Sequence, residues 1–172
     1  MQATDRSAIK RGLLIALIVW VGLSVEIFLT NVVFPSKTDD DVIPVLVSYL
    51  CVFGALFLTG AIAGRAGAGR KGQLLAGLIA GMAIGALTVV TFLVVDNVWL
   101  DVVAQQQTKI DGFAQSGAAS MRSYINQGLI GPAVFFTAVF GVFGVILSLA
   151  GGLVGSKPPP SPATTTPDRT TS

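Results

Sequence analysis

Residues 59–85 decide the fold, and they read TGAIAGRAGAGRKGQLLAGLIAGMAIG. Two apolar segments flank a short turn that carries Arg65, Arg70 and Lys71, and the second segment has a glycine at every fourth position. Glycines at this spacing lie on one face of a helix and let it approach a neighbouring helix closely in lipid. Basic residues favour the cytoplasmic side of a membrane. The stretch therefore predicts two packed membrane helices joined by a cytoplasmic turn.

The composition of the whole chain indicates a membrane protein. Of its 172 residues, 52% are hydrophobic and only 12% are charged, whereas about a quarter are charged in an average soluble domain. The chain has no histidine, and Cys51 is its only cysteine. A histidine-based catalytic site, a disulfide within the chain and a cluster of thiolate ligands are therefore excluded. The net charge of +2 gives no indication of nucleic-acid binding.

Four segments are apolar enough and long enough to cross a hydrocarbon core of about 30 Å. We expect these spans at residues 13–34, 42–63, 74–95 and 129–154. The basic start of the chain is similar to the first part of a signal peptide, but the apolar run after it is too long and no cleavage pattern follows. The predicted fold is an all-α transmembrane domain over residues 12–155. It is an up-down-up-down bundle of four helices in which neighbours along the chain pack together.

The segments outside the spans are polar. Residues 1–11 are a basic N-terminus, and residues 156–172 are rich in proline and threonine and should be disordered. Residues 96–127 carry apolar residues at helical spacing, which predicts a partly helical segment on the membrane surface or over the mouth of the bundle. Interruptions of this segment are expected at Asp111-Gly112 and at Ser116-Gly117.

The basic residues predict the orientation. With the N-terminus inside, the inner segments hold eight basic residues and the outer segments hold three, which places both termini in the cytoplasm and residues 96–127 outside. The inner residues are Arg6, Lys10, Arg11, Arg65, Arg70, Lys71, Lys157 and Arg169, and the outer ones are Lys37, Lys109 and Arg122. Without a removable signal or a disulfide pattern, the location that we predict is a bacterial cytoplasmic membrane.

Small residues recur at every fourth position on three spans, as in a glycine zipper. They are Gly60 and Gly64, then Gly77, Gly81 and Gly85, and finally Gly144, Ser148 and Gly152. Association of helices in lipid depends on close packing, which small residues permit. These faces can hold one chain together, or one of them, most readily the face of Gly77, can pair with another subunit. The sequence leaves both alternatives open.

Residues 67–72 match the dinucleotide-binding pattern G-x-G-x-x-G. That pattern binds a dinucleotide only between a strand and a helix, whereas here it lies between two membrane helices. Contact of Arg65, Arg70 and Lys71 with anionic lipid head groups accounts for the same basic turn. The acidic residues 39–41 could hold a hard cation, but they are better explained as helix caps. We therefore expect neither a cofactor nor a metal.

Glu26 is the only charged residue within the four predicted spans. An ionisable group at such a depth faces the bundle interior or a water-filled path in most membrane proteins. At a rise of 1.5 Å per residue, Tyr49, Thr88 and Thr137 lie at a comparable depth on the other spans, as does Cys51. We expect a largely neutral Glu26 that hydrogen-bonds to one of the hydroxyls. Transport of an ion, proton or substrate, or pairing with another protein, are the alternatives.

The chain lacks a Ser–His or Cys–His pair, so we expect that it is not an enzyme. Three functions are compatible with the sequence, and we favour the first. It is a structural or accessory component that packs through glycine-rich faces, in a homo-oligomer or a larger membrane complex. The second is an oligomeric transporter or channel that uses Glu26. The third is a membrane sensor that uses the external residues 96–127.

Overall fold

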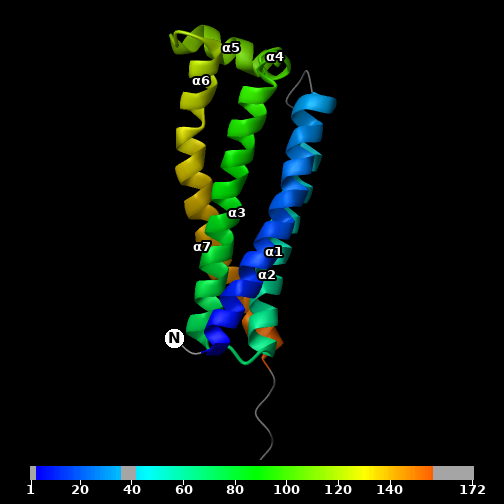
Figure 1. Cartoon of the computed structure of the whole chain (residues 1–172), viewed down its shortest axis with the longest axis vertical. Helices are drawn as coiled ribbons and strands as arrows, with labels where there is room; N and C mark the ends of the chain where they lie inside the picture. Colours follow the sequence, from blue (N-terminus) through cyan, green and yellow to red (C-terminus); the bar gives the residue numbers. More distant parts are fainter. Residues whose placement is uncertain (1–2, 36–41, 157–172) are drawn as a thin grey trace, which may run out of the picture.

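The computed structural model describes residues 3–35 and 42–156, and all the regular structure in these ranges is helical (Figure 1). Four helical stretches in them are long and apolar enough to cross a membrane, which confirms the predicted all-α class with four such segments. The elements are α1 (Ala3–Phe28), the π-helical η1 (Leu29–Val33), α2 (Val42–Arg65), α3 (Arg70–Val98), α4 (Leu100–Val103), α5 (Gln107–Ser116), α6 (Met121–Gly128) and α7 (Ile130–Gly155).

The long helices extend beyond the predicted apolar spans. The first begins at Ala3, so the basic residues of the N-terminus belong to its first turns. The third begins at Arg70, which shortens the connection after α2 to residues 66–69. Gly67 has a φ of 75° in this tight turn, a conformation that glycine adopts without steric cost. The acidic turn at residues 36–41 and the tail from residue 157 lie outside the described residues.

The largest interfaces join α3 to α7, α2 to α7 and α1 to α3. The contacts between α1 and α2 and between α2 and α3 are smaller, although these helices follow one another in the chain. The expectation that neighbours along the chain pack together therefore holds for the largest interface, which joins the third and fourth long helices, and was wrong for the next two, which join long helices that do not follow one another. The contact of α2 with α7 has its physical reason in small residues, because Gly60 and Gly64 let the two backbones meet at Ser148 and Gly152.

The core of the bundle contains fully buried apolar side chains such as Val52, Leu56 and Ile84. Large apolar side chains on the opposite faces, Ile18 and Val142 among them, are exposed. A soluble protein would cover such faces, whereas a lipid bilayer requires them because hydrocarbon is their solvent. The distribution of side chains therefore fits a bundle embedded in a membrane.

Short helices α4, α5 and α6 lie at the end of the bundle opposite the N-terminus (Figure 1). Gly117, with a φ of 66°, ends α5, and the Ser120 hydroxyl accepts a hydrogen bond from the Ser123 N–H at 3.2 Å to begin α6. The predicted interruption at Asp111-Gly112 was wrong, because both residues lie inside α5. Gly112 serves close packing instead, since a side chain there would meet the Tyr124 hydroxyl.

Candidate functional site

One half of the bundle is closed by backbone contact between helices. We call it the glycine half, and it comprises residues 57–64 of α2, 73–85 of α3 and 140–155 of α7. A Cβ atom at Gly60 would overlap the carbonyl oxygen of Ser148, and one at Gly64 would lie 2.6 Å from the carbonyl oxygen of Gly152. Because any side chain would force the helices apart, glycine is required at both positions.

The third helix meets α7 in the same way. Three glycines of α3 lie against the backbone of α7, the pairs being Gly77 with Gly144, Gly81 with Phe140 and Gly85 with Thr137. This is the face that the sequence left open for another subunit. In the structure it is covered by a helix of the same chain.

Buried polar groups add hydrogen bonds to the glycine half. The Ser148 hydroxyl donates to the Gln73 carbonyl oxygen at 2.8 Å, and the Gln73 side-chain amide donates to the Ala68 carbonyl oxygen at 3.0 Å. Gly152 lies beside this amide and leaves room for it. Both side chains are buried and hydrogen-bonded, so their burial costs little, and the Ser148 bond joins α7 to α3.

The other half of the bundle contains a cavity, so we call it the cavity half. It comprises residues 23–31, 42–53 of α2, 88–92 of α3 and 130–137 of α7, together with the rings of Phe140 and Phe143 at its border with the glycine half. Residues 42–53 of α2 include no glycine. Aromatic rings lie between α2 and α7 instead, with the centroids of Tyr49 and Phe140 at 6.0 Å and those of Phe53 and Phe143 at 4.9 Å. Rings of this size keep the two backbones apart.

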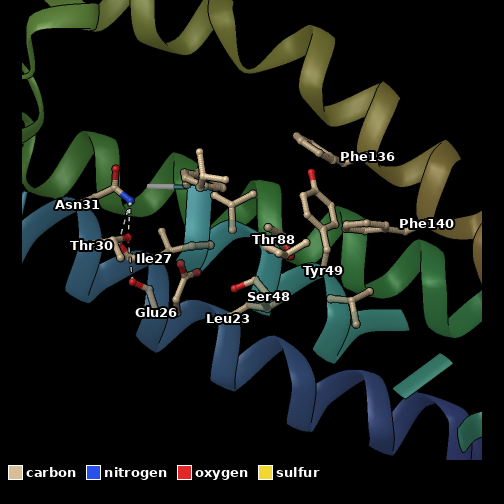
Figure 2. A pocket seen from close by; sticks show the side chains of 15 residues that line it. Leu23, Glu26, Ile27, Thr30, Asn31, Ser48, Tyr49, Thr88, Phe136 and Phe140 are labelled. Atoms are coloured by element: carbon tan, nitrogen blue, oxygen red, sulfur yellow. Dashed lines mark hydrogen bonds between the residues drawn. The ribbon is translucent and has the colours of Figure 1, made fainter. Parts of the chain in front are cut away.

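The cavity is open on one side and has a volume of about 670 Å³. Most of its lining is apolar, and its polar groups come from three helical segments (Figure 2). It is lined by Leu23, Glu26, Ile27, Thr30, Asn31, Val42, Val45, Leu46, Ser48, Tyr49, Val52, Thr88, Phe92, Phe136 and Phe140.

Glu26, Tyr49 and Thr88, which the sequence placed at a common depth, line the same cavity. Thr137 does not line it, because its backbone packs against Gly85 instead. Cys51 is exposed on the outer face of α2. The depth argument therefore selected three of the lining residues and failed where the rotation of a helix about its axis decided the outcome. Whether Glu26 is neutral stays a prediction.

The hydroxyl groups around the cavity are not all hydrogen-bonded. Thr30 donates to the backbone carbonyl of Glu26 at 3.0 Å. In contrast, the hydroxyls of Ser48 and Tyr49 form no hydrogen bond with any residue that the structure describes. The Thr88 hydroxyl is buried and also has no partner within the described ranges. A buried hydroxyl without a partner costs about 1–3 kcal/mol, so this lining is built at the expense of stability.

Asn31 is a lining residue that the sequence analysis missed. Its side-chain amide donates to the Ile27 carbonyl oxygen at 2.9 Å, and the backbone N–H of Phe34 reaches back to Leu29 at 2.8 Å. Such competition for carbonyl groups widens the last turn into the π-helical η1. A polar residue near the end of an apolar span was the signal that could have identified it.

A separate polar network joins α1 to α3 beside the cavity. The Trp20 indole N–H donates to the Thr91 hydroxyl at 2.9 Å, and the Ser24 and Thr91 hydroxyls are 2.9 Å apart. Thr91 also donates to the Leu87 carbonyl oxygen at 3.1 Å. Ser24 is therefore engaged with Thr91 and does not line the cavity.

The wall of the cavity is incomplete on the side of α7. That helix contributes only Phe136 and Phe140, whereas α2 lines the cavity from Val42 to Val52. Among the described residues, α7 adds no lining beside Val42 and Leu46, whose side chains are 71% and 56% exposed. Such apolar, exposed residues are compatible with hydrocarbon as their solvent.

The basic turn lies far from the cavity. Arg65 ends α2, Arg70 and Lys71 begin α3, and all three side chains are exposed at the end of the bundle where α1 begins (Figure 1). They are free to contact lipid head groups or solvent, and they form no part of the cavity lining.

Comparison of the chain with protein-family models, with curated proteins and with solved structures finds no match. The function is therefore inferred from the cavity and its surroundings.

Proposed function

We propose that this protein is a non-enzymatic accessory component of a membrane that binds a small apolar or amphipathic molecule in its cavity. The carrying observation is an open cavity of about 670 Å³ whose apolar walls hold one carboxyl group and several hydroxyl groups. Ligand sites have volumes of about 300–1,000 Å³ and combine apolar walls with a few polar groups. In this proposal the glycine faces hold the helices of one chain together. The protein then acts by binding a ligand in its cavity, and its glycine faces bind no second protein.

In this proposal the four long helices cross a bacterial cytoplasmic membrane in up-down-up-down order, with both termini in the cytoplasm. The N-terminal end of α1 and the basic turn between α2 and α3 lie at the same end of the bundle, which supports a common cytoplasmic side (Figure 1). The cavity half then lies in the outer leaflet, and lipid-soluble molecules reach it from there.

Photocrosslinking in nanodiscs tests the proposal, with a fatty alcohol that carries a diazirine as the probe. Ser48 lines the cavity, whereas Val47 beside it on α2 is 53% exposed on the lipid side. We expect Ser48→Trp to fill the cavity and to lower labelling of the lining residues by about tenfold, which corresponds to about 1.4 kcal/mol. The matched variant Val47→Trp should label like the wild type.

Labelling of the lipid-facing residues other than Val47 is the internal control, because neither tryptophan replaces any of them. Equal labelling of the lining residues in Ser48→Trp and Val47→Trp would show that the probe does not enter the cavity. The proposed function would then be rejected.

A second candidate is an oligomeric transporter or channel, which is favoured by the position of Glu26 in the cavity lining. An ionisable group within a span is typical of ion and proton pathways. The closed glycine half blocks a continuous path along a single chain, so transport requires either assembly of several chains or movement of the helices. Proton flux into liposomes, reported by a pH-sensitive dye and abolished by Glu26→Gln, would establish it. Equal flux in that variant would remove Glu26 from the pathway.

A further inference from the structure

Two hydroxyl groups of the cavity lining, those of Ser48 and Tyr49, have no acceptor for their hydrogen among the described residues. Other hydroxyls of the long helices are satisfied by their own backbone, as when Thr59 donates to the Ala55 carbonyl oxygen at 2.9 Å. A tyrosine hydroxyl lies at the far end of a rigid ring, so it requires a partner from outside its own helical turn. The O–H group of Tyr49 is therefore available to a ligand of the cavity.

The Tyr49 side chain stands among aromatic rings. Its ring meets that of Phe140 edge-on with centroids 6.0 Å apart, and the centroid of Phe140 is 5.9 Å from that of Phe136. The side chain points away from α2, with its hydroxyl directed towards Phe136 (Figure 2). A hydrogen bond from this hydroxyl would form among apolar rings, where it is electrostatically stronger than in water.

The partner that Tyr49 lacks is a hydrogen-bond acceptor. A phenolic hydrogen is more acidic than that of an alcohol, and the ring withdraws electrons from the oxygen, so this hydroxyl donates more strongly than it accepts. A ligand made of hydrocarbon alone would leave the O–H group unpaired, which is unfavourable in apolar surroundings. A carbonyl oxygen on an apolar frame would accept the hydrogen and place that frame against Phe136 and Phe140.

We infer that the cavity binds a lipid-soluble carbonyl compound, whose oxygen accepts a hydrogen bond from the Tyr49 hydroxyl and whose apolar part packs against Phe136 and Phe140. The inference rests on the proposed function, because it names the class of ligand for the same cavity. The carbonyl group can belong to the ester of a membrane lipid or to a smaller compound dissolved in the membrane, and both present the same acceptor.

Fluorenone and fluorene test the inference, because they share a flat aromatic frame and only fluorenone has a carbonyl group. Equilibrium dialysis measures their binding to the full-length protein in nanodiscs of an ether-linked phosphatidylcholine, a lipid without carbonyl groups. Partition of each molecule into empty nanodiscs is subtracted. We expect the wild type to bind fluorenone about fivefold more tightly than fluorene, as is typical of one hydrogen bond.

Tyr49→Phe removes the hydroxyl and keeps the ring, so it should abolish the preference for fluorenone. An infrared spectrum separates this role from a merely structural one. The carbonyl band of bound fluorenone, identified by isotope labelling of its carbonyl carbon, should lie at a lower frequency in the wild type than in Tyr49→Phe, because a hydrogen bond weakens the C=O bond. The matched control is Tyr124→Phe, which changes the only other tyrosine of the chain, on α6 and outside the cavity lining. It should keep the wild-type preference and the wild-type band.

Equal affinity of the wild type for the two molecules would overturn the inference, and so would an unchanged preference in a Tyr49→Phe protein that is folded by circular dichroism. If the diazirine probe still labels the cavity lining in those cases, the proposed function stands and only the ligand class is wrong.

The same dialysis in nanodiscs of an ester-linked phosphatidylcholine distinguishes the two sources of the carbonyl group. A lower apparent affinity for fluorenone than in the ether-linked lipid would show competition by the lipid ester and identify a lipid as the occupant. Equal affinity in the two lipids would identify a smaller carbonyl compound instead.

Discussion

The glycine half and the cavity half of the bundle are built from the same four helices but are packed in opposite ways. In the glycine half, Gly60 and Gly81 lie against backbone atoms of α7, which leaves no space between the helices. In the cavity half, the rings of Tyr49 and Phe140 lie between α2 and α7 and line an open cavity of about 670 Å³. The comparison shows that the size of the side chains at the helix contacts decides whether this bundle is solid or hollow.

The difference follows from the solvent of these helices. Because lipid is as apolar as the side chains, burying apolar surface between membrane helices gains little, and close packing and hydrogen bonds hold them together. The glycine half has both, including the bond from Ser148 to Gln73. The cavity half lacks close backbone contact between α2 and α7 and is joined through α1 and α3 by the network around Thr91. We therefore expect stability to reside in the first half and binding in the second.

Of the variants that test the contrast between the two halves, Gly60→Ala should change the free energy of unfolding most. The new methyl group would meet the backbone of Ser148, which is unable to move away as a flexible side chain would. We expect the free energy of unfolding to fall by about 1–3 kcal/mol or more, as for other overpacked interiors. Unfolding by SDS in mixed micelles, followed by circular dichroism, measures this change.

Gly54→Ala is the matched control on the same helix, since nothing lies within 4 Å of a Cβ atom at Gly54. Its free energy of unfolding should stay within about 0.5 kcal/mol of the wild-type value. If the two alanine variants unfold alike, backbone contact at Gly60 does not stabilise the bundle, and the contrast between the two halves loses its energetic basis.

A smaller difference in the free energy of unfolding is expected between variants of Thr88 and Thr91, which lie almost one turn apart on α3. Thr91→Val removes hydrogen bonds to Trp20 and Ser24 and should lower the free energy of unfolding by about 0.6–1.7 kcal/mol, the range for hydrogen bonds between membrane helices. Thr88→Val removes a buried hydroxyl that has no partner among the described residues, so stability should be unchanged or higher. The same SDS titration compares them.

A lower stability of Thr88→Val than of Thr91→Val would contradict the assignment of these hydroxyls. It would mean that Thr88 makes a stabilising contact in the membrane, and that the cavity lining is not built at the expense of stability.

The depth of each side chain could be predicted from the sequence, and its direction could not. A helix rises 1.5 Å per residue whatever its rotation, so Tyr49 and Thr88 could be predicted near Glu26, and all three line the same cavity. Thr137 is close to that level too, but α7 is rotated so that its backbone meets Gly85 and the residue does not line the cavity. Depth depends on the chain itself, whereas rotation depends on the neighbouring helix.

For the glycines, too, the sequence predicted one property and the structure decided another. Their spacing in the sequence indicated faces that permit close approach, but Gly77 could equally have faced a second subunit. Only the structure pairs it with Gly144 of the same chain. A glycine has no side chain and therefore no chemical preference among partners, so its partner is set by the shape of the whole bundle.

By itself, the sequence determined the four apolar helices, because a run of apolar residues of that length in lipid must satisfy its backbone hydrogen bonds internally. It also determined that Glu26 is the single acidic residue within the four predicted spans. The tertiary structure decided that α7 packs on α2 as well as on α3, and that Glu26 lines a cavity together with Tyr49 and Thr88. The reason is physical: these arrangements depend on contacts between residues far apart in the chain, which composition and spacing do not encode.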